Sequence, residues 1–205
     1  SKLEAHNKAA YTELGGGQTY IQSDSDGWEY ICTDFEYEYQ VLGKEFGPYD
    51  LALTHRYITD VCSLLDKGRR VVHFCASKNS FRAASACLAS LCITYRGDVT
   101  GAQAAQYFNN IRLEPFRDAN LGASSFDLTL EHVCGGFEFA VREGWFDLET
   151  FDRKAWEHYQ QLPNGDMNWI VPARILAFAG PSDTLVDEQG QEGCHPDLYV
   201  IHREA

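Results

Sequence analysis

The chain has 205 residues, of which 44% are hydrophobic, and it carries a formal net charge of −13 at pH 7. This length is sufficient for one globular domain with its own core, and an aromatic content of 13% excludes a wholly disordered chain. Nucleic acid and anionic membranes are poor partners for so acidic a protein, because their phosphates require Lys and Arg. Basic peptides or proteins are expected partners instead. The alternative is that the acidity serves only solubility.

The cysteine pattern favours reduced thiols over metal binding. The sequence has seven cysteines but no CxxC pair and no Cys/His spacing typical of zinc, so we expect neither a metal nor another cofactor. Several cysteines stand in apolar stretches such as ASACLASLCITY, which indicates buried thiols and a cytoplasmic or nuclear protein. No apolar run reaches the length of a transmembrane helix.

Taken in chain order, the first half of the sequence alternates predicted strands and helices. Residues 1–19 are polar and indicate a flexible leader. The elements expected next are a strand around 19–21, an extended half-buried segment within 23–40, a helix opened by Pro48 over 51–66, a short buried strand at 71–74, a loop at 75–80 and a long apolar helix over 80–96.

The second half predicts three more helices and one strand. Thr100 and Gln103 have the spacing of a capping box for a helix over 102–111, and Ser124 with Asp127 is predicted to cap the next helix, which Gly144 ends. The remaining expectations are a loop at 115–120, a short polar helix over 149–161, a turn at 163–166, a strand at 174–180 and an acidic linker at 181–205.

Strands interleaved with helices favour an α/β domain over residues 20–180, with a central, mostly parallel sheet covered by helices. The strand, loop and helix from Val71 to Arg96 form the unit that cradles phosphate in cysteine-dependent phosphatases. Such a loop runs His-Cys, five residues, then Arg, so that the thiolate attacks phosphorus while the guanidinium holds two oxygens.

This chain departs from that pattern. Phe74 rather than a histidine precedes Cys75, six residues separate Cys75 from Arg82, and the loop contains no glycine. We therefore expect a degenerate phosphate loop without catalytic residues, in which Cys75 is a buried small side chain. The alternative is a weak residual anion site formed by Lys78 and Arg82. Arg82 is alternatively a structural residue that holds a loop or a carboxylate in place.

Several motifs resemble the N-terminal domain of the cell division cycle 14 dual-specificity protein phosphatases. The motifs are EFGP at 45–48 with Arg56-Tyr57, the strand at 72–74 with Arg82-Ala83, PFRDA at 115–119, and the run GWFDLETFDRKAWEHYQQLPNGDMNWIVPARILAFAGP from Gly144 to Pro181. The resemblance extends over about residues 20–200. It implies a phosphatase-like fold that is followed, after the linker, by a second domain.

The resemblance implies that the second domain of these family members carries all the catalytic chemistry. It implies that the first domain is inactive alone and forms one wall of an acidic groove, which selects phosphoserine followed by proline and a basic residue. The implied partners are a catalytic domain, in cis or in trans, and basic phosphoserine-proline peptides or proteins. The implied locations are the cytoplasm and nucleus, with the centrosome, spindle or cilium as further possibilities.

The resemblance also identifies candidate substrate-binding acids. The Glu of the EHY motif is Glu157 and the Asp of the NGD motif is Asp166, whereas a further acid common in the family is replaced by Gln160. Glu149 and Asp152 lie nearby in sequence and are candidates to compensate. The alternative for each acid is a solvated helix face or, for Asp166, a turn former.

Two other functions remain open at this point. The chain is alternatively a free-standing pseudophosphatase that acts as an adaptor or structural component on microtubule or ciliary assemblies. An active enzyme of another type has little support, because no Gly-rich nucleotide loop or zinc motif is present and the helix residues His55 and His132 have no evident catalytic partners.

Overall fold

A computed structural model of the chain describes residues 20–23, 26–33, 47–75, 79–97, 99–117 and 123–178. The chain divides into two compact units, one up to Glu143 and one from Gly144 onward, and each unit is described on its own. The predicted leader, the acidic linker and half of the predicted extended segment at 23–40 lie outside the described residues. In the part of the chain that is described, no helix is both long and apolar enough to cross a membrane.

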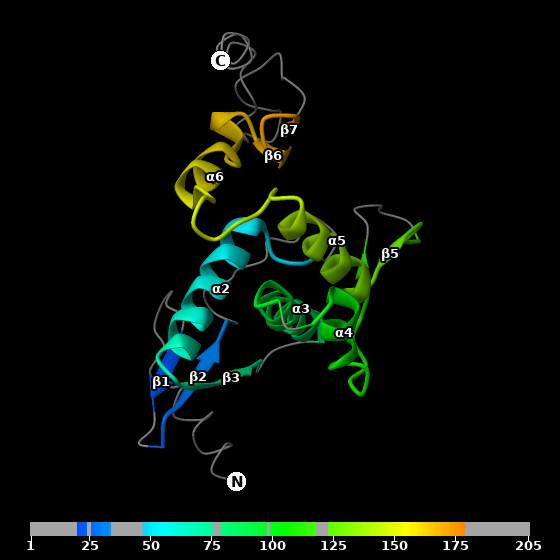
Figure 1. Cartoon of the computed structure of the whole chain (residues 1–205). Helices are drawn as coiled ribbons and strands as arrows, with labels where there is room; N and C mark the ends of the chain where they lie inside the picture. Colours follow the sequence, from blue (N-terminus) through cyan, green and yellow to red (C-terminus); the bar gives the residue numbers. More distant parts are fainter. Residues whose placement is uncertain are drawn as a thin grey trace. The chain divides into compact units, whose positions relative to one another are not determined.

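A three-stranded sheet opens the first unit. Strand β1 (Tyr20–Ser23) pairs antiparallel with β2 (Trp28–Cys32), and β2 pairs parallel with β3 (Arg70–Phe74). The helix α2 (Leu51–Asp66) connects the two parallel strands and packs on β3, as Figure 1 shows. A parallel pair joined through a helix confirms the predicted α/β class. Strand β3 is half-buried rather than buried, because β2 is its sole strand neighbour in the described sheet.

Local chemistry explains where α2 begins and how the sheet edge is held. The backbone N–H of Leu53 donates to Asp50 Oδ1 at 2.8 Å, so Asp50 is the N-cap. The helix has the predicted bounds of 51–66, and Pro48 lies two residues before the cap. Before β3, Arg69 Nε donates to Glu29 Oε1 at 2.7 Å, and Glu29 is only 4% exposed. This ion pair joins β2 to the chain segment that enters β3.

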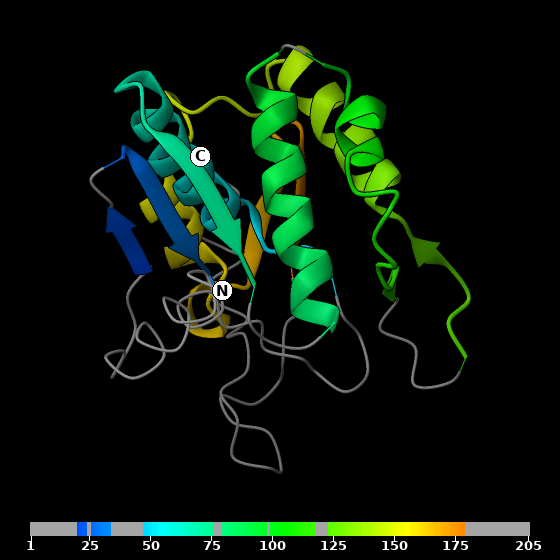
Figure 2. The same cartoon turned by 90° about the horizontal axis from the view of Figure 1, so that it is seen from below.

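The described residues of the first unit include three further helices, which are α3 (Asn79–Tyr95), α4 (Gly101–Gln106) and α5 (Leu130–Arg142). Figure 2 shows α3 beside β3, and α3 also packs against α2, α4 and α5. The predicted Thr100–Gln103 capping box is confirmed, but the helix ends at Gln106 instead of 111. A Cβ on Gly101 would lie 2.4 Å from the carbonyl oxygen of Cys134, so glycine allows α4 to approach α5 closely.

Two predictions between α4 and α5 are wrong. Thr129 caps α5 in a capping box with His132, and Ser124 instead donates to the carbonyl of Phe126. The predicted loop at 115–120 contains β4 (Phe116–Arg117), which pairs antiparallel with β5 (Asp127–Leu128). The Phe126 ring is 59% exposed, because it precedes the helix instead of lying on its apolar face.

The second unit contains α6 (Arg153–Tyr159), the 3-10 turn η1 (Leu162–Asn164) and an antiparallel hairpin of β6 (Met167–Val171) and β7 (Ile175–Phe178). The helix is shorter than the predicted 149–161, because Asp147 binds the amides of Glu149 and Thr150 in a turn of its own. The sequence predicted one strand here, at 174–180, which corresponds to β7, and it did not predict β6. Its turn places Ala173 at φ +57°, a conformation that sequence patterns rarely reveal in alanine.

Candidate functional site

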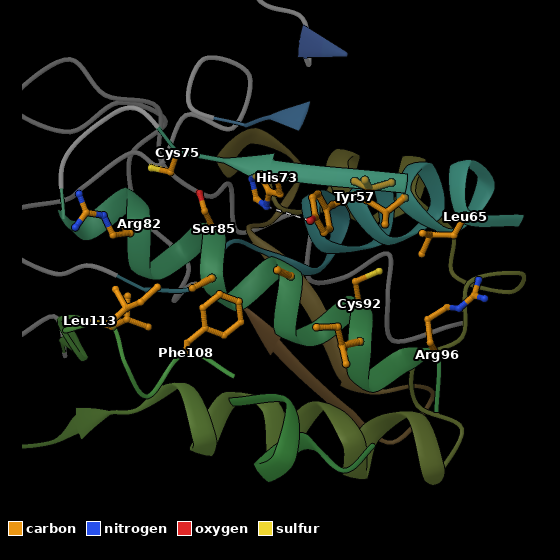
Figure 3. Close-up of a pocket in the computed structure, with 16 residues that line it drawn as sticks. Tyr57, Leu65, His73, Cys75, Arg82, Ser85, Cys92, Arg96, Phe108 and Leu113 are labelled. Atoms are coloured by element: carbon orange, nitrogen blue, oxygen red, sulfur yellow. Dashed lines mark hydrogen bonds between the residues drawn. The ribbon is translucent and has the colours of Figure 1, made fainter. Parts of the chain in front are cut away.

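The predicted phosphate loop lies between β3 and α3. Cys75 follows the last residue of β3 and is half-buried, and Arg82 lies in the first turn of α3 with an exposed side chain. Figure 3 shows both side chains at the same end of a pocket. Lys78 lies outside the described residues. The strand–loop–helix order of a phosphate site is therefore present, and Cys75 and Arg82 flank the loop with the sequence spacing that departs from a catalytic one.

His73, the strand residue before Phe74, is held by two hydroxyl groups. The hydroxyl of Tyr57 on α2 lies 3.0 Å from His73 Nδ1, and Thr33 Oγ1 lies 3.1 Å from His73 Nε2. Thr33 Oγ1 also lies 3.4 Å from the hydroxyl oxygen of Ser85 on α3. Both ring nitrogens are thus engaged in hydrogen bonds that join the sheet to α2 and α3, and neither is left to activate a nucleophile.

The pocket beside this network has a volume of about 520 Å³. Apolar side chains of α2, β3 and α3 and of the segment 108–113 supply most of its lining. Arg82 and Arg96 lie at its opposite ends, as Figure 3 shows. The pocket is therefore a mainly apolar space with a guanidinium group at each end.

Three other thiols of the first unit are poor nucleophiles because they are buried. Desolvation raises the pKa of Cys92 to about 12, with a smaller contribution from Cys62, and it raises the pKa of Cys134 to about 11 despite a hydrogen bond from Ser90. Desolvation also raises the pKa of Cys87 well above its usual range. Because the thiolate is the reactive species, none of these three thiols is expected to be the first to attack an electrophile at neutral pH.

The four candidate acids belong to the second unit, on or near α6. Glu149 is exposed in the turn that precedes the helix, and Asp152 is the N-cap, with its Oδ1 accepting from the Ala155 amide at 3.0 Å. Glu157 is exposed on the helix, where its Oε1 lies 3.5 Å from Arg153 Nε one turn earlier. Asp152 therefore has a clear local role, and the charge of Glu157 is partly compensated.

Asp166 lies in a turn that is bonded to the end of α6. Its amide donates to the carbonyl of Gln161 at 3.1 Å, and the Asn164 side chain donates to the carbonyl of His158 at 2.9 Å. Asp166 has φ +41° next to Gly165 at +108°, and its side chain is exposed. The turn chemistry predicted from PNGD is confirmed, and it places Asp166 in the segment that follows the helix carrying Glu157.

The His73 network was missed by sequence reasoning. Its members Thr33, Tyr57 and Ser85 lie 40, 16 and 12 residues from His73, so no local spacing could have signalled it. Among the residues that the structure describes, no three His, Cys, Asp or Glu side chains gather in a group able to hold a metal ion.

The chain matches the family model of the N-terminal half of dual specificity protein phosphatases over residues 12–140. It is 32% identical over 188 residues to dual specificity protein phosphatase CDC14AB of Danio rerio, 33% over 181 to CDC14A of Mus musculus, and 31% over 182 to tyrosine-protein phosphatase cdc-14 of Caenorhabditis elegans. Each match covers 83% of this chain, whereas the chain spans only 29%, 29% and 26% of those relatives.

Proposed function

Because the chain belongs to the N-terminal half of the dual specificity protein phosphatases and has CDC14-type relatives, we propose that it is a non-catalytic domain that selects substrates for a phosphatase catalytic domain. The catalytic domain would act in cis or in trans. Phosphate-ester cleavage would occur there, and this chain would supply a surface for pairing with it and an acidic surface for the substrate.

The His73 network carries the non-catalytic part of the proposal. In a reactive cysteine site a nearby base or cation stabilises the thiolate, whereas His73 is engaged at 3.0 and 3.1 Å by Tyr57 and Thr33. The six-residue separation of Cys75 and Arg82 agrees with this role. The polar side chains beside the predicted degenerate phosphate loop thus hold the sheet to its helices.

Exposed carboxylates support the substrate-selecting part. Glu157 lies on α6, and Asp166 lies in the turn that is hydrogen-bonded to the end of α6. Both side chains are exposed. An exposed carboxylate paired with a Lys or Arg contributes about 0.2–1 kcal/mol, which ranks ligands without binding any of them tightly. The surface would favour phosphoserine-proline peptides that carry basic residues.

A nuclear magnetic resonance titration, which detects weak binding, tests this role. We expect a basic phosphoserine-proline peptide to bind the chain in a salt-sensitive manner, and the Glu157→Gln/Asp166→Asn double variant to weaken binding by a factor of about 2–30. The control is Glu114→Gln/Asp127→Asn, which removes two exposed charges from the first unit. Equal weakening by both double variants would show only a general charge effect and would contradict the proposal.

Localisation to the cytoplasm and nucleus, and to the centrosome, spindle or cilium, stays a prediction of the resemblance. Imaging of the tagged chain in cells that divide would check it.

A further inference from the structure

Helices α2 and α3 face each other through two matching pairs of residues. On α2, Cys62 lies one turn before Asp66, and Cys92 of α3 lies one turn before Arg96, the residue that follows the helix. Arg96 donates to Asp66 Oδ1 at 2.8 Å, where the two helices end. Figure 3 shows that α2, from Tyr57 to Leu65, and α3, from Arg82 to Arg96, run in the same direction. One turn before the ion pair, the two cysteines must therefore face each other.

Electrostatic interactions agree with this placement. Cys92 interacts with Cys62 and with Arg96, and Arg96 interacts with Cys62 as well as with Asp66. Cys62 is half-buried, and Cys92 and Arg96 line the pocket of about 520 Å³. Two sulfur atoms thus meet beside a guanidinium group, next to a space large enough to admit a small oxidant.

We propose that Cys62 and Cys92 are a redox-sensitive pair that forms a disulfide between α2 and α3 when the protein meets hydrogen peroxide. The Cys62 sulfur, after losing its proton, attacks one peroxide oxygen and becomes a sulfenic acid, and one water leaves. The Cys92 sulfur then attacks the sulfenic sulfur, and its proton leaves with the hydroxyl group as a second water. Two thiols and one peroxide give one disulfide and two waters, and a thiol reductant reverses the bond.

The surroundings assign the two roles. Arg96 interacts with Cys62, and an adjacent guanidinium stabilises the negative charge of an attacking sulfur. Burial raises the pKa of Cys92 to about 12, so Cys92 is not the thiol that attacks peroxide, and it loses its proton only as it attacks the sulfenic sulfur beside it. The inference does not depend on the proposed function, because neither cysteine belongs to the loop that follows β3.

The same unit contains internal controls. Cys87 and Cys134 are electrostatic neighbours, but they are 1% and 0% exposed and so are closed to peroxide. Cys75 is half-buried and lines the same pocket. Peroxide can oxidise both half-buried thiols, Cys75 and Cys62, but we expect a disulfide at Cys62 because Cys92 lies beside it.

The test is peptide mass spectrometry of the intact 205-residue chain in a Cys194→Ser background, after hydrogen peroxide and alkylation of the remaining thiols. We expect a Cys62–Cys92 cross-linked peptide that a thiol reductant removes. The cross-link should be lost in Cys62→Ser and in Cys92→Ser and kept in Cys75→Ser. In Arg96→Gln, which keeps both thiols, the cross-link should form more slowly.

Three results would overturn the proposal. The first is that the parent chain forms no cross-link under conditions that oxidise Cys75. The second is that a Cys87–Cys134 cross-link forms instead of the Cys62–Cys92 cross-link. The third is that Arg96→Gln forms the Cys62–Cys92 cross-link at an unchanged rate. Circular dichroism of each variant before oxidation ensures that a lost cross-link is scored only in a folded protein. If both serine variants unfold, the rate at which Arg96→Gln forms the Cys62–Cys92 cross-link still tests the proposal.

Discussion

The segment from β3 into α3 and the segment from α6 into β6 differ in where they direct their polar side chains. In the first, His73 binds Tyr57 and Thr33, and the polar residues Ser85 and Ser90 of α3 are 6% and 0% exposed. In the second, Glu157 and Asp166 are exposed. A strand–loop–helix unit can therefore keep the architecture of a phosphate site while its polar groups serve packing, and the exposed acids proposed to select substrates belong to another part of the chain.

The largest effect is expected from the core of the first segment. Leu88 on α3 is 1% exposed, and Leu88→Ala should lower the free energy of unfolding by about 2–5 kcal/mol because it removes buried methyl groups and leaves a cavity. Urea unfolding measures the change. Peptide affinity of the folded variant should be unchanged, and a parallel loss of affinity would break the separation between the two segments.

The next effect concerns pH. Burial raises the pKa of Cys134 from 9.0 to about 11, so the unfolded chain loses this proton at a lower pH than the folded chain. The stabilisation is complete below about pH 9 and is lost as the pH rises toward 11, by about 2 kcal/mol. Urea unfolding with reductant present, from pH 8 to 11, should show a shallower decline for Cys134→Ala. The same slope in both proteins would refute this assignment.

The network around His73 is expected to contribute less. Tyr57→Phe removes the hydroxyl that lies 3.0 Å from His73 Nδ1, and it should cost about 0.5–1.5 kcal/mol of stability. Thermal or urea unfolding of Tyr57→Phe beside the parent chain measures it. A gain of stability would show that the hydroxyl is not a structural partner of His73.

The smallest effect separates two roles of Asp152. Asp152→Ala should destabilise the second unit by about 1 kcal/mol, because the Ala155 amide loses its cap, whereas Asp152→Asn should keep the cap and remove the charge. Unfolding curves and peptide titrations of both variants distinguish the roles. If Asp152→Asn weakens binding of a basic peptide without loss of stability, Asp152 also selects ligands; unchanged binding leaves it a cap alone.

Much of the fold could be predicted from local chemistry. The capping box at Thr100, the glycine stop at Gly144 and the helical spacing of α2 are signals within one element, and the structure confirms them. The β4–β5 pair and the β6–β7 hairpin were missed, because the β4–β5 pairing depends on partners ten or more residues apart and the hairpin turn depends on Ala173 at positive φ.

The candidate site shows the same limit. The loss of catalytic spacing between Cys75 and Arg82 could be read from the sequence, because it is a count along the chain. The partners of His73 and the facing of Cys62 toward Cys92 could not, because they depend on how α2 and α3 pack. Side-chain roles that depend on packing between elements become visible only in three dimensions.

The most direct test is a turnover assay with the purified chain. A phosphoserine-proline peptide that carries basic residues would be incubated with the 205-residue protein, with the Cys75→Ser variant and with buffer, and released phosphate would be measured. We predict that neither protein releases phosphate above the buffer rate. Turnover by the parent chain that disappears in Cys75→Ser would contradict the non-catalytic role of the β3–α3 segment.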